Sequence, residues 1–170
     1  ADEVKNSILP LYKPNDDEEE FLADLLRQAI KLCPENLKLI EQSLEQASKD
    51  NSKLVVFPEL FLTGYSIGDQ LDTLAENLNG PSIKQIQTIC EKYKVYTVIG
   101  IAEQGEHDEY YISLLLIDDK GEILECYRKT HLFDGEKEHF SAGDELKVIS
   151  TPIGNIGLLI CFEVEFPEIA

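Results

Sequence analysis

Apolar side chains recur at helical spacing in several segments of the chain. After an extended arm over residues 1–14, this pattern predicts a helix over residues 15–33, whose acidic first turn suits the helix dipole and which Pro34 ends. A second helix is expected from about Asn36, and another begins at Pro81, which suits a first helical turn. The buried faces of these last two helices are expected to consist of Leu37, Ile40, Leu44 and Ala47, and of Ile83, Ile86, Cys90 and Tyr93.

Short apolar runs between polar or glycine-containing loops predict strands. The predicted strands cover residues 53–57, 95–102, 110–117, 122–127, 146–150 and 156–160. The third and fourth are joined by the sequence Asp118, Asp119, Lys120, Gly121, which indicates a hairpin. Helices and strands that alternate first and are followed by a run of strands favour an α/β protein with a mixed β-sheet and helices on a face.

The composition is that of an ordinary globular protein with the length of one domain. The 170 residues are 43% hydrophobic and 28% charged, which is enough to bury a core without disulfides. The net charge of −18 argues against nucleic acid or an anionic membrane as the main partner, because the long-range field repels both. No signal peptide and no bilayer-spanning segment is visible, so we expect a cytoplasmic protein. Ala1 is the first residue and methionine is absent, so the start is processed or the chain is a segment of something longer.

Neither the cysteines nor the histidines form a recognisable metal-binding pattern. The four cysteines contain no C-x-x-C pair, which argues against a zinc or redox site. The chain is also too long and too poor in cysteine for a disulfide scaffold. The three histidines match no usual ligand spacing, so we expect no bound metal.

Three residues of different chemistry each follow a predicted strand: Glu59, Lys129 and Cys161. Taken singly, each has an ordinary interpretation, as a loop carboxylate, a solvated lysine and a small buried side chain. Ligand sites of open α/β sheets gather at the C-terminal ends of the strands, so we expect these three side chains to meet there. A carboxylate, an ammonium and a thiol supply a base, an oxyanion donor and a nucleophile for acyl transfer.

A resemblance to a known family is carried by three segments, LVVFPELFLTGY, YRKTHLF and GLLICFEVEFPEIA, which are similar to the signature segments of the nitrilase superfamily of carbon–nitrogen hydrolases. The family's glutamate, lysine and cysteine fall in chain order on Glu59, Lys129 and Cys161. The loop DGEKEHFSAGD resembles the family segment with a second glutamate. That glutamate falls on Glu136, or on Glu138 if the loop aligns differently.

The resemblance covers residues 36–170 and divides the chain in two. Residues 1–35 are then an acidic N-terminal arm and helix, and the remainder is a nitrilase-like catalytic region that is incomplete at its C-terminus. The implied fold is part of a four-layer α-β-β-α sandwich, and relatives usually form homodimers through their helical layers. Many relatives have arginine and asparagine where this chain has Glu165 and Ile112, and these departures bear on the substrate.

The resemblance also implies a chemistry that needs no cofactor. Glu59 would take the thiol proton of Cys161, whose thiolate attacks a carbonyl or nitrile carbon. Lys129 and the backbone N–H of Phe162 would stabilise the tetrahedral oxyanion. Glu136 would position the substrate or support the lysine. The expected substrate is a small linear amide or N-carbamoyl compound, hydrolysed through a cysteine thioester with release of ammonia or an amine.

Three other interpretations stay open. The chain could be the glutaminase part of an amide-dependent NAD synthetase, although the FPE sequence after the cysteine favours a simple amidase-like branch. It could be a truncated binding or assembly module without turnover, because the chain ends soon after Cys161. Cys161 could also form a cysteine–histidine pair with His131 or His139.

Overall fold

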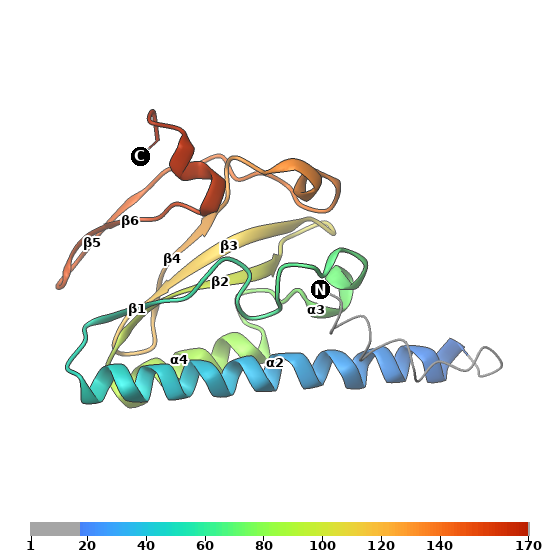
Figure 1. The fold of residues 1–170 in the computed structure, drawn as a ribbon, viewed down its shortest axis with the longest axis horizontal. Coiled ribbons are helices and arrows are strands. Elements are labelled where there is room, and N and C mark those ends of the chain that lie inside the picture. The colour runs from blue at the N-terminus through green and yellow to red at the C-terminus, as the bar shows by residue number, and fades with distance from the viewer. Residues whose placement is uncertain (1–17, 170) are drawn as a thin grey trace.

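A computed structural model describes residues 18–169, with side chains described from Pro34 onward (Figure 1). The arm predicted over residues 1–14 and the predicted start of the first helix lie outside the described residues. In chain order the elements are α2 Glu18–Lys49, β1 Leu54–Val56, η2 Gly68–Gln70, α3 Leu71–Leu74, α4 Pro81–Tyr93, β2 Tyr96–Gln104, β3 Tyr110–Ile117, β4 Ile123–Arg128, η3 Asp134–Glu138, β5 Val148–Thr151, β6 Gly154–Gly157 and η4 Cys161–Glu165.

The first four strands form a mixed sheet in the order β1-β2-β3-β4, which confirms the predicted α/β fold. β1 pairs with β2 in parallel, whereas the β2–β3 and β3–β4 pairs are antiparallel. The predicted hairpin turn is present: Gly121 has φ +82°, and the Asp118 carboxylate accepts hydrogen bonds from the backbone N–H groups of Lys120 and Glu122. Because β1, β2 and β4 run in the same direction, the chain leaves β1 and β4 at the same edge of the sheet.

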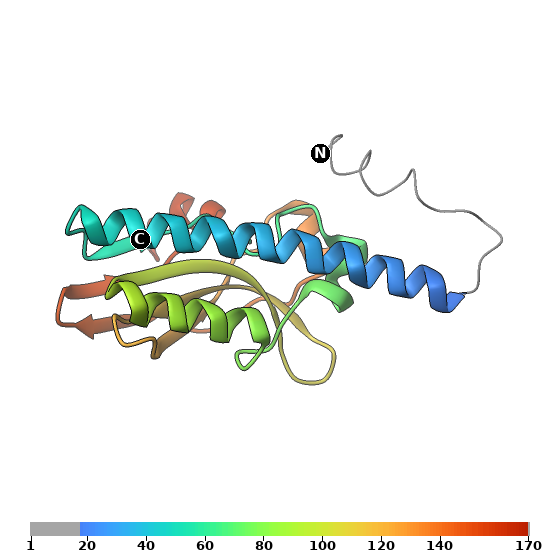
Figure 2. The same ribbon diagram turned by 90° about the horizontal axis from the view of Figure 1, so that it is seen from below.

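Two helices cover one face of this sheet, and a hairpin lies over the other. α2 and α4 run side by side on one side, while β5, β6 and η4 lie on the opposite side (Figure 1 and Figure 2). Side-chain alternation explains how both faces are buried. Ile99 and Leu115 face the helices, whereas Val98 and Leu116 belong to the core beneath the hairpin. The sheet is therefore a layer between two hydrophobic cores.

The helix end predicted at Pro34 is wrong, because α2 continues through this residue without interruption. A proline in a helix interior costs roughly 3 kcal/mol, since it removes one backbone hydrogen bond and its ring crowds the preceding turn. Tertiary packing holds the turns that follow: Leu37, Ile40 and Leu44 are buried in the core shared with α4, as their spacing predicted. Although α2 has 32 residues, no helix in the described part of the chain is both long and apolar enough to cross a membrane.

The strand predicted over residues 156–160, directly before Cys161, is also misplaced. β6 stops at Gly157 and pairs with β5 in a separate two-stranded sheet, and Cys161 is instead the first residue of η4. The apolar run before the cysteine is nevertheless buried, because Leu158 and Ile160 join the core on this face. The hydrophobic pattern thus indicated burial correctly but not strand pairing.

Gly100 lets the chain that leaves β1 cross closely over β2. A Cβ at this position would overlap the carbonyl oxygen of Pro58 and lie 2.5 Å from the backbone nitrogen of Leu60. The backbone N–H of Leu62 also donates a hydrogen bond to the carbonyl oxygen of Gly100 at 3.2 Å. The loop that carries Glu59 is therefore held directly against β2.

We predict that Gly100→Ala lowers the free energy of unfolding by about 1–3 kcal/mol, because a change of rotamer cannot relieve overpacking against backbone atoms. Urea denaturation measures this loss. Gly157→Ala is the matched control, since no heavy atom lies within 4 Å of a Cβ built there. The control should stay within about 0.5 kcal/mol of wild type. Equal stability of the two variants would contradict the close crossing.

Candidate active site

Lys129 lies at the centre of a buried cluster of charges. It follows β4 directly, at the sheet edge where β1 also ends, and its side chain is 0% exposed. Its Nζ lies 2.6 Å from Glu59 Oε1, 2.9 Å from Glu136 Oε1 and 2.8 Å from Glu136 Oε2. The three N–H groups of an ammonium are thus all matched by carboxylate oxygens. The structure brings Glu59 and Lys129 together, as expected from the strand directions, and adds Glu136.

Of the two glutamates proposed for the following loop, Glu136 and not Glu138 reaches this lysine. Glu136 is the third residue of η3 and its side chain is 5% exposed, whereas Glu138 is exposed. Its carboxylate also accepts a hydrogen bond from the backbone N–H of Phe133 at 2.7 Å, and its own N–H donates to the carbonyl oxygen of Phe133 at 2.9 Å. These reciprocal bonds fix the turn with the carboxylate directed at Lys129.

Burial and hydrogen bonding act in opposite directions on the charges of this cluster. Burial lowers the pKa of Lys129, but the hydrogen bonds and charges of Glu136 and Glu59 outweigh it and raise that pKa above its ordinary value. Burial raises the pKa of Glu136, but hydrogen bonds from Lys129 and Tyr65 outweigh it and lower that pKa. The cluster therefore holds a protonated lysine and an ionised Glu136 at neutral pH.

Tyr65 is a neighbour of the cluster that the sequence did not single out, although it closes the segment FPELFLTGY. Its side chain is half exposed, but its hydroxyl donates a hydrogen bond to Glu136 Oε1 at 2.7 Å. Loss of hydration raises the pKa of Tyr65, as do the Glu136 hydrogen bond and the charges of Glu136, Glu59 and Cys161.

Cys161 presents its thiol on an exposed turn. Its φ of +50° lies in the left-handed region, which costs a residue other than glycine on the order of 1–2 kcal/mol. Fully buried Glu163 braces the turn by accepting a hydrogen bond from the backbone N–H of Ile160 at 2.7 Å. Cys90 and Cys126 are poor nucleophiles by contrast, because burial raises their pKa to about 11 and about 12. Among the cysteines with described side chains, Cys161 is the exposed one.

Aromatic side chains pack around this turn. Phe162 lies in η4, next to the cysteine, and its ring meets Phe133 and Phe166 edge-on at centroid distances of 5.2 and 5.0 Å. Phe162 is the second residue of the short helix, where backbone N–H groups lack partners within the helix. Its N–H therefore has no partner within η4, and its expected role as an oxyanion donor stays a prediction.

The two histidines considered as partners for the cysteine lie in different surroundings. The ring of His131 packs on Phe166 with 4.3 Å between centroids, and its Nδ1 lies 2.9 Å from Thr130 Oγ1. His139 is exposed, and its ring lies beside Gly68. His131 thus packs in the aromatic group beside η4, and His139 lies at the surface.

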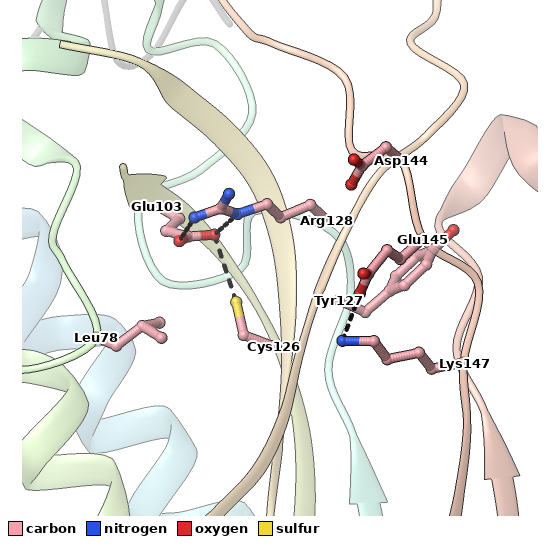
Figure 3. A pocket seen from close by; sticks show the side chains of 8 residues that line it. All are labelled: Leu78, Glu103, Cys126, Tyr127, Arg128, Asp144, Glu145 and Lys147. Carbon is pink, nitrogen blue, oxygen red and sulfur yellow. Dashed lines mark hydrogen bonds and ion pairs between the residues drawn. The ribbon is translucent and has the colours of Figure 1, made fainter. Parts of the chain in front are cut away.

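A pocket of about 340 Å³ lies beside β4, and none of the residues of the Lys129 cluster lines it. Its walls are formed by Leu78, Glu103, Cys126, Tyr127, Arg128, Asp144, Glu145 and Lys147 (Figure 3). Buried Glu103 accepts hydrogen bonds from Arg128 Nη2 at 2.6 Å, from Arg128 Nε at 3.0 Å and from Ser113 Oγ at 2.6 Å. This carboxylate is thus matched within the fold and is not free to bind a ligand.

Comparison with known proteins matches residues 29–170 to the family model described as carbon–nitrogen hydrolase. A probable nitrilase of Schizosaccharomyces pombe is 33% identical over 152 residues, which cover 85% of this chain and 56% of the relative. A 2-oxoglutaramate amidase of Bacillus subtilis is 32% identical over 136 residues, which cover 79% of this chain and 52% of the relative. The crystal structure of an amidase from Nesterenkonia sp. superposes with a TM-score of 0.73 at 27% identity, covering 80% of this chain and 52% of that one. The chain spans about half the length of these relatives.

We predict that Glu136→Gln lowers the free energy of unfolding at pH 7 by about 1–3 kcal/mol, because glutamine keeps the shape but not the charge that offsets Lys129. The folded-state pKa of Glu136 is lowered, so its contribution is present above the unfolded pKa of about 4.3 and is lost as the pH falls through the folded value. In urea unfolding experiments, the difference from wild type should therefore shrink as the pH is lowered below about 4.

Glu138→Gln is the matched control, because this glutamate lies in the same loop and is exposed. It should change stability by less than about 0.5 kcal/mol at either pH. A loss in Glu136→Gln that stays the same at all pH values would show that the charge of Glu136 is not what stabilises the cluster.

Proposed function

Because the chain belongs to the carbon–nitrogen hydrolase family, we propose that it hydrolyses the carbon–nitrogen bond of a small linear amide or N-carbamoyl compound. The observation that carries this proposal is the buried contact of Lys129 with Glu59 and Glu136. In this proposal the fixed positive charge, the carboxylate and the exposed thiol of Cys161 form one site, because the side chain of Glu163 contacts both Thr130, next to Lys129, and Ile160, next to Cys161. These are the groups that acyl transfer to a cysteine requires.

In the proposed first half-reaction, Glu59 accepts the thiol proton of Cys161 as the sulfur attacks the carbonyl carbon. The carbonyl electron pair moves onto oxygen, and Lys129 and the backbone N–H of Phe162 stabilise this oxyanion. The intermediate collapses when Glu59 returns the proton to the leaving nitrogen. Ammonia or an amine departs, and the acyl group remains on Cys161 as a thioester.

In the second half-reaction, Glu59 takes a proton from water, and the water oxygen attacks the thioester carbon. The carbon–sulfur bond breaks, the proton returns to Cys161, and the carboxylic acid leaves. One water is consumed in each cycle, and the chain's own side chains carry every proton. Glu136 keeps Lys129 charged and in place, and we assign it a further part in orienting the substrate.

The chemistry of the relatives supports this substrate class. The amidase from Nesterenkonia sp. AN1 has been crystallised with acrylamide and with butyramide. In another variant of that amidase, the acetamide moiety of fluoroacetamide is attached covalently to the active-site cysteine. These compounds are small linear amides, and the adduct supports cysteine as the nucleophile in this chain as well.

We predict that the chain releases ammonia from members of a panel of small linear amides, ureido acids and nitriles, and that Cys161→Ala abolishes the release because no thioester can form. Cys126→Ala is the control and should retain most of the activity, since its thiol is buried and protonated. Release that persists in Cys161→Ala would refute the proposed nucleophile. A folded wild-type chain without any release would favour a binding module.

We predict that Lys129→Ala lowers kcat by about 10²–10³-fold, because the oxyanion loses its fixed positive charge. The kcat of His131→Ala should stay within about fivefold of wild type, since the His131 ring packs on Phe166. Steady-state kinetics on variants shown to be folded by circular dichroism make this comparison. The reverse order of effects would favour a cysteine–histidine pair.

A further inference from the structure

We propose that Glu163 is a positioning residue that holds the turn carrying Cys161 in register with the segment that follows Lys129. This role rests on the proposed function, because it concerns the same site. Glu163 lies two residues after the cysteine, and its side chain is fully buried. A carboxylate in that position must be matched by donors, and the identity of those donors indicates what it does.

The two oxygens of Glu163 contact two different segments of the chain. Oε1 accepts hydrogen bonds from the hydroxyl of Tyr127, the backbone N–H of Thr130 and the hydroxyl of Thr130, each at 2.7 Å, and from the backbone N–H of His131 at 3.3 Å. Oε2 accepts a hydrogen bond from the backbone N–H of Ile160 at 2.7 Å. All five donors are hydroxyl or backbone groups.

One carboxylate therefore bridges the residues on either side of the proposed chemistry. Thr130 directly follows Lys129, and Ile160 directly precedes Cys161. Figure 1 shows the corresponding arrangement, with η4 beside the end of β4. Both segments contact a single side chain, so their relative position is set by direct hydrogen bonds as well as by residues 131–159, which connect them.

The same carboxylate maintains the strained conformation of the cysteine. The backbone N–H of Glu163 donates to the carbonyl oxygen of Ile160 at 3.1 Å, while its Oε2 accepts from the N–H of the same residue. These two bonds close the turn in which Cys161 adopts φ +50°. A left-handed non-glycine residue persists only where surrounding contacts impose it, and Glu163 supplies those contacts.

Glutamine at this position separates the two halves of the bridge. Burial raises the pKa of Glu163, but the hydrogen bonds from Thr130, Tyr127 and the Ile160 N–H outweigh it and lower that pKa, so the carboxylate is ionised. Glutamine has one acceptor oxygen instead of two. If that oxygen serves the four donors at Oε1, the amide NH₂ faces the Ile160 N–H and the contact with the cysteine turn is lost.

Tyr127→Phe is the comparison that distinguishes positioning from a merely structural contribution. It removes one of the donors to Oε1 and leaves the bond between Oε2 and Ile160 intact. A second control, Glu168→Gln, alters an exposed glutamate a few residues further along the chain.

The test measures kcat and KM for amide hydrolysis and, separately, the rate of iodoacetamide labelling at the Cys161 peptide by mass spectrometry. Glu163→Gln should lower kcat by about 10–100-fold with KM within about threefold, because the nucleophile is misplaced and substrate binding is not. Labelling should slow by at least about fivefold, because the thiol moves away from its base. The kcat and the labelling rate of Tyr127→Phe should both stay within about threefold of wild type, and those of Glu168→Gln should match wild type.

Two results would overturn this role. One is a kcat and a labelling rate in Glu163→Gln that stay within about twofold of wild type. The other is a decrease of kcat and labelling rate in Glu163→Gln and Tyr127→Phe that is proportional to the decrease of Tm in each variant. If Glu163→Gln fails to fold, Glu163→Asp keeps both oxygens but shortens their reach, and should still lower kcat by about tenfold. A wild-type chain that is labelled at Cys161 but releases no ammonia would refute the proposed function, while slower labelling in Glu163→Gln would still support the positioning role.

Discussion

The buried ammonium of Lys129 is the constraint on which the rest of the site depends. Its side chain is 0% exposed, and an unmatched charge at such a position would cost several kcal/mol. The fold must therefore bring Glu59, from the loop after β1, and Glu136, from η3, to the same point. The sheet satisfies this requirement because β1 and β4 run in the same direction. Gly100 contributes by letting the loop that carries Glu59 lie close against β2.

Two glutamates perform related tasks on two short 3-10 turns. Glu136 and Glu163 are each the third residue of their turn. Each accepts a hydrogen bond from the backbone N–H of the residue that precedes the turn, which is Phe133 for Glu136 and Ile160 for Glu163. Their remaining contacts differ: Glu136 contacts the Lys129 ammonium, whereas Glu163 contacts hydroxyl and backbone donors. One glutamate thus sets the charge of the site, and the other sets the position of its backbone.

Hydrophobic periodicity was sufficient to predict the sheet and its hairpin, because strand burial follows the alternation of side chains. It failed at Pro34, where one lost hydrogen bond did not end α2, and at the run after Gly157, where apolar residues are buried without pairing. The strand ends indicated Glu59 and Lys129, but the turn geometry of η3 was needed to choose between Glu136 and its exposed neighbour Glu138. Glu163 carried no signal, because a glutamate in an acidic segment shows its burial only in three dimensions.

Observing the acyl group on the cysteine is the most direct test of the proposed reaction. The wild-type chain would be quenched in acid during turnover of a small linear amide, and its peptides mapped by mass spectrometry. We expect the peptide containing Cys161 to gain the mass of the acyl group, and this adduct to disappear once the substrate is consumed. Ammonia release without an acyl group on Cys161, or with the group on another residue, would contradict the proposed reaction.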